Sequence, residues 1–203
     1  VDADCLGLFH FDGSLNSHKG VSAIGDENFD TGCFGQAVRV EEGTTNLFVN
    51  PFFIGTYTGG LAPNWTKAGT CTLSESTDSS FSIYGGKSQH VSDMAQYSGI
   101  GQDLTLTAGT TYTVTIYCYI VEGSSICFQV NDGTWKASYI NNKTGWQKAS
   151  FTFTAAQTNV AFNIVNAKTD VAEIYADAVQ IEAKDHATPF VDGTRIGVLK
   201  APT

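Results

Sequence analysis

The sequence predicts an all-β protein: a two-sheet antiparallel β-sandwich (jelly roll) with extended N- and C-terminal arms. Only 15% of the 203 residues are charged and 21 are glycine, a composition that suits short strands and tight turns better than helices. Apolar and polar residues alternate along several segments, which gives each strand one buried and one solvent-facing side. No segment shows the periodicity of an amphipathic helix.

The first 45 residues are predicted to form an N-terminal arm. Gly7–Gly13 has the pattern of a short strand running into a turn, and Gly32–Val40 that of a second strand after a glycine-rich bend. Two strands do not make an independent domain. We therefore expect residues 1–45 to pack on the main body or on a partner.

Residues 46–183 are predicted to form the sandwich itself. Its alternating segments are Gln102–Thr107, Tyr112–Ile120, Ile126–Val130, Lys148–Thr154, Val160–Ile164 and Glu173–Glu182. Turn residues separate them: Ala108–Thr110 joins two strands, Glu122–Ser125 is expected to be a hairpin loop, and Asn131–Gly133 places a glycine where a positive φ is wanted.

Residues 184–203 are predicted to form a C-terminal arm or linker. Pro189 cannot donate a ladder hydrogen bond, which excludes a central strand at that point. Gly193 to Thr203 are expected to leave the sandwich as a tail.

Charge and cysteine content exclude several classes of function. The net charge of −9 disfavours non-specific binding to nucleic acid, which needs lysine and arginine to neutralise the phosphates. It also disfavours binding to anionic membrane surfaces. No apolar run approaches the roughly 18 residues that suggest membrane insertion. The five cysteines form an odd set without a CxxC pair, so we expect reduced thiols rather than a disulfide framework.

Several short motifs are spread along the middle of the chain. The opening run Asn46–Phe53 is followed by Trp65, Trp146 leads into an alternating strand, and Asp177 lies in the closing strand. Over roughly residues 45–182 this pattern resembles the jelly-roll carbohydrate-binding modules found beside xylanases and related glycoside hydrolases. The resemblance implies the jelly-roll fold, with Trp65 and Trp146 as packing residues.

The same resemblance raises the question of calcium. The family often has a glutamate bound to structural calcium directly after the opening run, where this chain has Ile54. An aliphatic side chain supplies none of the oxygen ligands that calcium requires. We therefore predict no cofactor and no metal site, with Asp177 left as a weak candidate ligand.

The segments that flank this module carry a second resemblance. Glu41–Leu47 before it and Ala187–Arg195 after it resemble segments of bacteriophage tail and other virion surface proteins, and Leu8–Gly13 resembles a first strand of concanavalin-like or laminin-G-like lectin sandwiches. This implies a virion-surface location after assembly in the host cytoplasm, as a tail-fibre, tail-associated or head-decoration protein. Exposed strand edges in the arms imply a homo-oligomer or other virion proteins as partners.

The sequence does not predict an enzyme. Its acidic residues are scattered, whereas glycoside hydrolysis needs two carboxylates at a defined separation. The four histidines are isolated along the chain, and no serine elbow or cysteine–histidine signature is present. Solvated surface charge accounts for these residues.

A sugar-binding surface is predicted from aromatic side chains that stack on pyranose rings. Trp135 and Tyr139 point to one face if their strand is regular, Gln129 lies on the neighbouring strand, and Tyr84 and Tyr97 lie in the stretch before Gln102. The alternative, that Trp135 and Tyr139 face the core, is left open by the sequence.

Three hypotheses of function follow. The first is a non-enzymatic structural or adhesion protein of a phage particle whose module binds host surface glycans or decorates the particle. The second is a carbohydrate-binding module of a bacterial polysaccharide-degrading enzyme. The third is a purely structural domain without a ligand, which burial of Trp135 and Tyr139 would favour.

Overall fold

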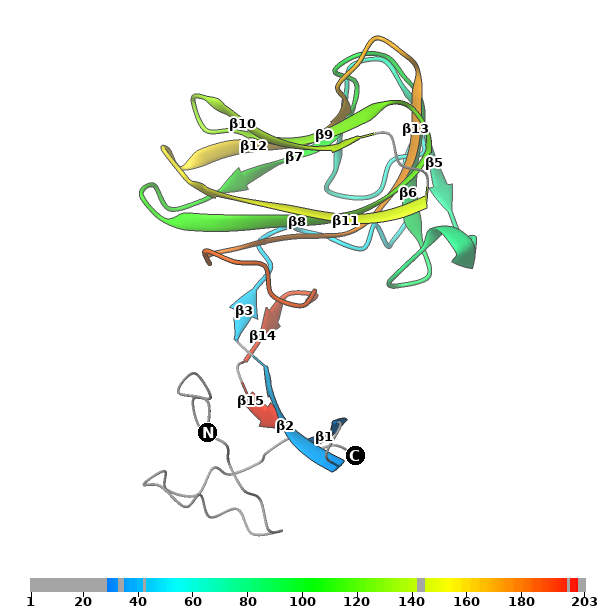
Figure 1. Cartoon of the computed structure of the whole chain (residues 1–203). Coiled ribbons are helices and arrows are strands. Elements are labelled where there is room, and N and C mark those ends of the chain that lie inside the picture. The colour runs from blue at the N-terminus through cyan, green and yellow to red at the C-terminus, as the bar shows by residue number, and fades with distance from the viewer. Residues whose placement is uncertain (1–28, 33–34, 42, 142–144, 197, 201–203) are drawn as a thin grey trace. The chain divides into compact units, whose positions relative to one another are not determined.

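The computed structural model describes residues 29–32, 35–41, 43–141, 145–196 and 198–200 (Figure 1). The chain divides into two compact units, residues 1–43 with 195–203 (unit 1) and residues 44–194 (unit 2). The predicted strand Gly7–Gly13, with its lectin-like resemblance, lies outside the described residues. Among the described elements, no helix is long and apolar enough to cross a membrane.

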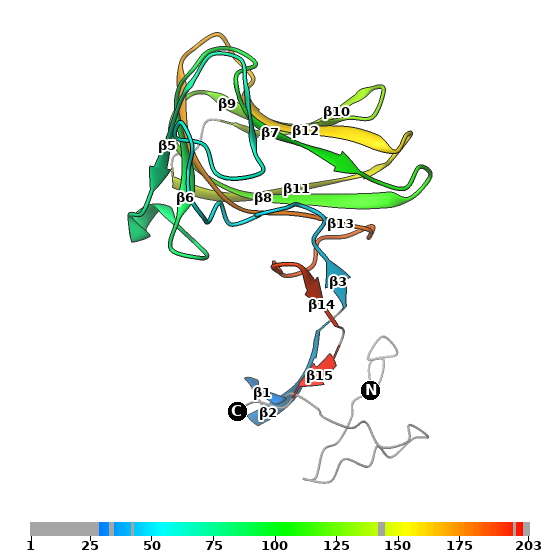
Figure 2. The ribbon, with the colours of Figure 1, turned by 180° about the vertical axis from the view of Figure 1, so that it is seen from behind.

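Unit 2 is a sandwich of two five-stranded antiparallel sheets, seen as two layers in Figures 1 and 2. The first sheet has the order β10-β9-β12-β7-β4 and the second the order β11-β8-β13-β6-β5. Their bounds are β4 Thr66–Ala68, β5 Thr72–Ser76, β6 Ser88–Met94, β7 Gly99–Thr105, β8 Thr111–Glu122, β9 Ser125–Asn131, β10 Trp135–Asn141, β11 Gly145–Thr154, β12 Asn159–Asn166 and β13 Ala172–Glu182. The described part of the chain is all-β apart from the short 3-10 turn η1 (Ser79–Phe81). The predicted fold class is confirmed.

Alternate side chains of each strand fill the space between the sheets. On β9, Ile126, Phe128 and Val130 are buried in the core cluster, which leaves the side chains between them on the outer face. Trp65 lies in the same core, 4.6 Å from the ring of Phe53 by centroids, and donates from Nε1 to the carbonyl of Asn50. Its predicted packing role is confirmed.

Trp146 packs differently. It is half-buried outside the core, edge-on to Tyr119 at 5.6 Å, and its Nε1 donates to the carbonyl of Ser80. Trp146 is thus a packing residue of the outer side of the second sheet.

One predicted hairpin is wrong and another is confirmed. β8 and β9, on either side of Gly123 and Ser124, belong to different sheets, so this short connection crosses the sandwich instead of pairing its flanking strands. Strand alternation reveals the buried face of each strand but not which sheet receives it. By contrast, β9 and β10 form a hairpin in which Trp135 pairs with Asn131, and Gly133 has the expected positive φ of 97°.

The stretch after β13 closes onto the sandwich up to Thr194, whereas residues 184–203 were predicted to be an arm. The backbone N–H groups of Thr188 and Val191 donate to the side chains of Glu182 and Gln180 on β13. Burial alone would raise the pKa of Glu182, but hydrogen bonds led by the Thr188 N–H lower it below its usual range. Glu182 therefore anchors this segment as a carboxylate.

Short strands also form where a plain tail was expected. β14 (Thr194–Arg195) pairs with β3 (Thr44–Thr45). In unit 1, β1 (Phe29–Gly32), β2 (Gly35–Glu41) and β15 (Val198–Lys200) form an antiparallel sheet of order β1-β2-β15. The predicted strand Gly32–Val40 corresponds to β2, with β1 preceding it.

Candidate functional site

The outer face of the first sheet carries two large aromatic side chains on its edge strand β10 and smaller side chains on its inner strands. Residues in register across antiparallel strands lie opposite one another, and three such rows cross this face. They are Tyr139–Cys127–Val165–Gly99, Ala137–Gln129–Asn163–Gly101 and Trp135–Asn131–Ala161–Asp103. The inner strands β9, β12 and β7 carry small or medium-sized side chains in these rows, whereas the large rings of Trp135 and Tyr139 lie on the edge strand β10. We call the surface between these rings and the loop before β7 the trough.

The aromatic residues of the edge strand β10 point to solvent. Trp135 is 58% exposed and Tyr139 is 54% exposed. They are four residues apart on one strand, so they share its outer face. The alternative that they pack in the core is excluded.

Tyr97 lies on the other side of the trough, in the loop before β7. Its side chain is 67% exposed, and its φ of 59° is in the left-handed region, which costs a residue other than glycine on the order of 1–3 kcal/mol. A hydrogen bond of 2.8 Å from its N–H to the carbonyl of Asn166 holds the backbone in place. Residues kept in such conformations cluster at functional sites.

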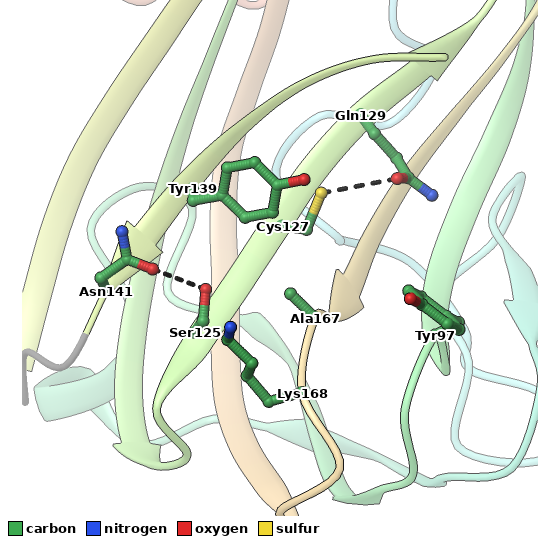
Figure 3. Close-up of a pocket in the computed structure, with 8 residues that line it drawn as sticks. All are labelled: Tyr97, Ser125, Cys127, Gln129, Tyr139, Asn141, Ala167 and Lys168. Carbon is green, nitrogen blue, oxygen red and sulfur yellow. Dashed lines mark hydrogen bonds between the residues drawn. The ribbon is translucent and has the colours of Figure 1, made fainter.

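A cavity of about 360 Å³ lies between Tyr139 and Tyr97 (Figure 3). Its lining residues are Tyr97, Ser125, Cys127, Gln129, Tyr139, Asn141, Ala167 and Lys168. Ser125 Oγ donates to Asn141 Oδ1 at 2.6 Å, and Cys127 Sγ donates to Gln129 Oε1 at 3.5 Å. Burial raises the pKa of Cys127 to about 11, so this thiol is neutral at physiological pH and acts as a small polar side chain.

A second cavity of about 530 Å³ continues from the first. It is lined by Ala68, Tyr97, Gln129, Trp135, Asn163 and Val165, and it shares Tyr97 and Gln129 with the first cavity. Two exposed rings and two side-chain amides thus line one hollow. Such rings can stack on apolar ligand faces, and the amides can donate to and accept from hydroxyl groups.

The buried side chain of Asp132 fixes the turn before Trp135. This buried carboxylate accepts from the N–H of Ala156 at 2.7 Å and forms an ion pair with Lys136. Burial would raise the pKa of Asp132, but the hydrogen bond from Lys136 and those from the backbone lower it below its usual value. Trp135 lies between Asp132 and Lys136 in sequence, so its backbone is fixed on both sides.

Four of the five predicted site residues, Trp135, Tyr139, Gln129 and Tyr97, lie on this face. Tyr84 does not, because its loop belongs to the second sheet: its ring is 4.8 Å from that of Phe190 and 6.3 Å from that of Tyr117 on β8. Asn163 and Asn141 also line the cavities, and neither was predicted from the sequence. Alternation marks them as outward-facing, but only strand order brings them beside Trp135 and Tyr139.

Asp177 is buried and surrounded by hydrogen-bond donors. Its Oδ2 accepts from the N–H groups of Ile83 at 2.6 Å and Tyr84 at 2.9 Å, and its Oδ1 accepts from that of Ala178 at 2.7 Å. Burial raises the pKa of Asp177 to about 6, and these hydrogen bonds limit the rise. The backbone of Ala178 has a positive φ of 49° at a bulge of β13, which turns the carboxylate toward the loop.

These surroundings do not fit calcium, which takes six to eight oxygen ligands. Amide N–H groups carry positive partial charge toward Asp177, where a cation would need further oxygens. Ile54 is 43% exposed and its N–H donates to Asn50 Oδ1. Within the described part of the chain, no cluster of three or more histidine, cysteine, aspartate or glutamate residues is placed to hold a metal ion.

His90 was predicted to be isolated, but it has two polar neighbours in the structure. On the outer side of the second sheet it lies between Ser74 Oγ, 2.8 Å from Nδ1, and Glu173 Oε1, 2.8 Å from Nε2, and its ring stacks on Tyr175 at 4.4 Å. The order matches a hydrolase triad, but Ser74 lies inside strand β5 and not on the sharp turn that exposes a nucleophile. The line of contacts cross-links three neighbouring strands.

Comparisons with known proteins bear on the sandwich. A family model described as a carbohydrate binding domain matches residues 45–169, whereas no curated protein sequence matches the chain. Similar solved structures include the CBM22-1-CBM22-2 tandem of Paenibacillus barcinonensis Xyn10C, with 18% identity and a TM-score of 0.53 over 73% of this chain and 48% of that chain. TmCBM61 in complex with β-1,4-galactotriose has 18% identity and a TM-score of 0.52 over 68% and 99% of the two chains.

A third similar structure is the enzymatically active domain of tailspike protein 4 of bacteriophage CBA120. It has 13% identity and a TM-score of 0.52, over 68% of this chain and 21% of that chain. This chain thus spans about a fifth of the tailspike domain and about half of the Xyn10C tandem. At these identities the likenesses establish the sandwich fold alone.

Proposed function

This chain belongs to the carbohydrate binding domain family, and from that premise we propose that the outer face of its first sheet binds a glycan. Trp135, Tyr139 and Tyr97 stack on the apolar faces of sugar rings, and the amides of Gln129 and Asn163 bind hydroxyl groups. Binding requires no catalytic step and no metal ion.

The exposure of Trp135 and Tyr139 is the observation that carries this proposal. Removing the apolar surface of an aromatic ring from water is favourable. Two rings that are more than half exposed on one strand can therefore gain binding free energy by covering a ligand. They lose little conformational entropy on binding because each has only two rotatable side-chain bonds. Their exposure also counts against a purely structural domain without a ligand.

Trp135→Ala tests the proposal. Affinity for soluble xylan, β-glucan and β-1,4-galactan is measured by isothermal titration calorimetry, and a stacking residue of this size is expected to cost about ten-fold or more. Tyr84→Ala is the matched control, because it removes an aromatic side chain that is 39% exposed away from this face. Equal affinities of wild type and Trp135→Ala for every glycan that binds would refute the assignment of the face.

For the whole protein, we propose a non-enzymatic structural or adhesion role on the surface of a phage particle, assembled in the host cytoplasm. The module would bind host surface glycans, and the partners would be copies of this chain or other virion proteins. The flanking segments Glu41–Leu47 and Ala187–Arg195 support this, and the fold likeness to a tailspike domain is consistent with it. Sedimentation of the chain as a monomer at all concentrations would count against assembly with copies of itself and leave other virion proteins as its partners.

The alternative is a carbohydrate-binding module of a bacterial polysaccharide-degrading enzyme. The fold likeness to the Xyn10C tandem and to TmCBM61 favours it. It predicts affinity for plant polysaccharides and none for intact bacterial cells. The phage role predicts the reverse.

A further inference from the structure

A third cavity, of about 620 Å³, lies on the outer face of the first sheet toward the β9–β10 turn. No aromatic residue lines it. The side chains that matter here are those of Asp103, Thr105, Asn131, Gln157 and Asn159, around the small Ala161. We call this group the polar hollow.

The polar hollow begins where the second cavity ends. Asn131 and Ala161 lie in the row of Trp135, and Asn163 of the second cavity is two residues further along β12. From Val165 to Asn159, β12 covers six residue steps, about 20 Å at 3.3 Å per residue. Only an oligosaccharide of several units covers that length.

The amides of the polar hollow keep hydrogen-bonding capacity. Asn131 Oδ1 accepts from the N–H of Gly133, and Gln157 Nε2 donates to the carbonyl of Asn159. Among the described residues, Asn131 Nδ2, Gln157 Oε1 and the side chain of Asn159 have no such partner. Donors and acceptors that project together from a concave surface suit the hydroxyl groups of a sugar.

Asp103 sets the charge of the polar hollow, because it is the only ionisable side chain in the lining. A carboxylate there accepts from hydroxyl groups but repels an anionic sugar. Lys168 lies at the opposite end of the face, in the first cavity. The two ends therefore differ in both charge and aromatic content.

We propose that the polar hollow binds further units of the glycan that stacks on Trp135, so that one chain runs along the strands from the aromatic end to the Asn159 end. The units in the polar hollow carry no negative charge. This inference rests on the proposed function, since it extends the same site.

The test measures affinity against chain length, using xylo- and cello-oligosaccharides from the disaccharide to the hexasaccharide in calorimetric titrations. Wild type is expected to gain affinity with each unit until the polar hollow is filled. The double variant Gln157→Ala/Asn159→Ala is expected to bind short oligosaccharides as wild type does and to lose about five-fold or more for the hexasaccharide, from two or more lost hydrogen bonds. Equal hexasaccharide affinity of wild type and double variant overturns the inference.

A second experiment, with a charged ligand, tests the role of Asp103. Asp103→Asn is expected to improve binding of a glucuronate-substituted xylo-oligosaccharide by about two- to five-fold, the size of a surface charge interaction, and to leave the neutral one unchanged. Asp93→Asn, on β6 of the second sheet, makes the same charge change elsewhere and is expected to have no effect. Failure of Asp103→Asn to favour the charged ligand overturns the neutral-unit part.

The outcomes also separate this inference from the proposed function. Binding that depends on Trp135 but not on chain length overturns the polar hollow alone. Absence of xylo- and cello-oligosaccharide binding at every length overturns this inference, and it overturns the proposed function as well if wild type also fails to bind galactan and intact bacterial cells.

Discussion

Both outer faces of the sandwich carry aromatic side chains, but those of the first sheet are exposed and those of the second sheet are packed. On the first sheet, Trp135 and Tyr139 are open to solvent beside the trough. On the second sheet, Phe81 of η1 stacks on Tyr175 at 4.1 Å, and Tyr175 in turn stacks on His90. The difference is the loop over the second sheet: where a loop covers the rings they stabilise the fold, and where no described segment covers them they are free to meet a ligand.

The largest expected effect separates stability from binding. Tyr175→Ala removes a ring held between Phe81 and His90, and we expect the free energy of unfolding to fall by about 3 kcal/mol. Chemical denaturation followed by tryptophan fluorescence measures this, and affinity of the folded variant for glycan should stay at the wild-type value. Trp135→Ala should do the opposite, with a stability change within about 0.5 kcal/mol. Loss of glycan binding in Tyr175→Ala at temperatures where it is folded would contradict the division of roles.

Asp177, which holds the covering loop, gives the next effect. Because burial raises its pKa from 3.8 to about 6, its contribution to stability is fully present below pH 3.8 and is lost as pH rises through about 6. The loss amounts to about 2–3 kcal/mol. Asp177→Asn does not titrate, so the difference in unfolding free energy between the two proteins should change by that amount between pH 4 and pH 7.5. A pH-independent difference would show that Asp177 titrates normally.

Tyr97 tests the strained margin of the first face. Tyr97→Gly relieves the positive φ and is expected to raise the free energy of unfolding by about 0.5 kcal/mol while lowering glycan affinity. Tyr97→Ala removes the same ring without relieving the backbone and serves as the control. If both variants bind like wild type, Tyr97 lies outside the glycan site.

The smallest expected effect is none. Because N–H donors surround Asp177, neither calcium nor EDTA should shift the melting temperature, which differential scanning fluorimetry measures. A metal that bound the folded protein alone would raise it, and a calcium-dependent rise would overturn our reading of these residues.

Much of the fold was predictable because alternation is a local property. Alternation located strands, and the glycine of Asn131–Gly133 marked a true hairpin. The Glu122–Ser125 hairpin failed because a short loop can pair two strands or carry the chain to the other sheet, and local pattern does not distinguish these. Tyr84 was misplaced for a similar reason, since hydrogen bonds to Asp177, distant in sequence, assign its loop to the second sheet.

By itself, the sequence determined that this protein is an antiparallel sandwich and which aromatic residues were candidates for binding. Only the tertiary structure decided that Trp135, Tyr139 and Tyr97 share one open face, while Tyr84 and Tyr175 pack on the other. The physical reason is that exposure depends on what lies across from a side chain. Strand order and loop coverage set this through contacts between residues far apart in the chain.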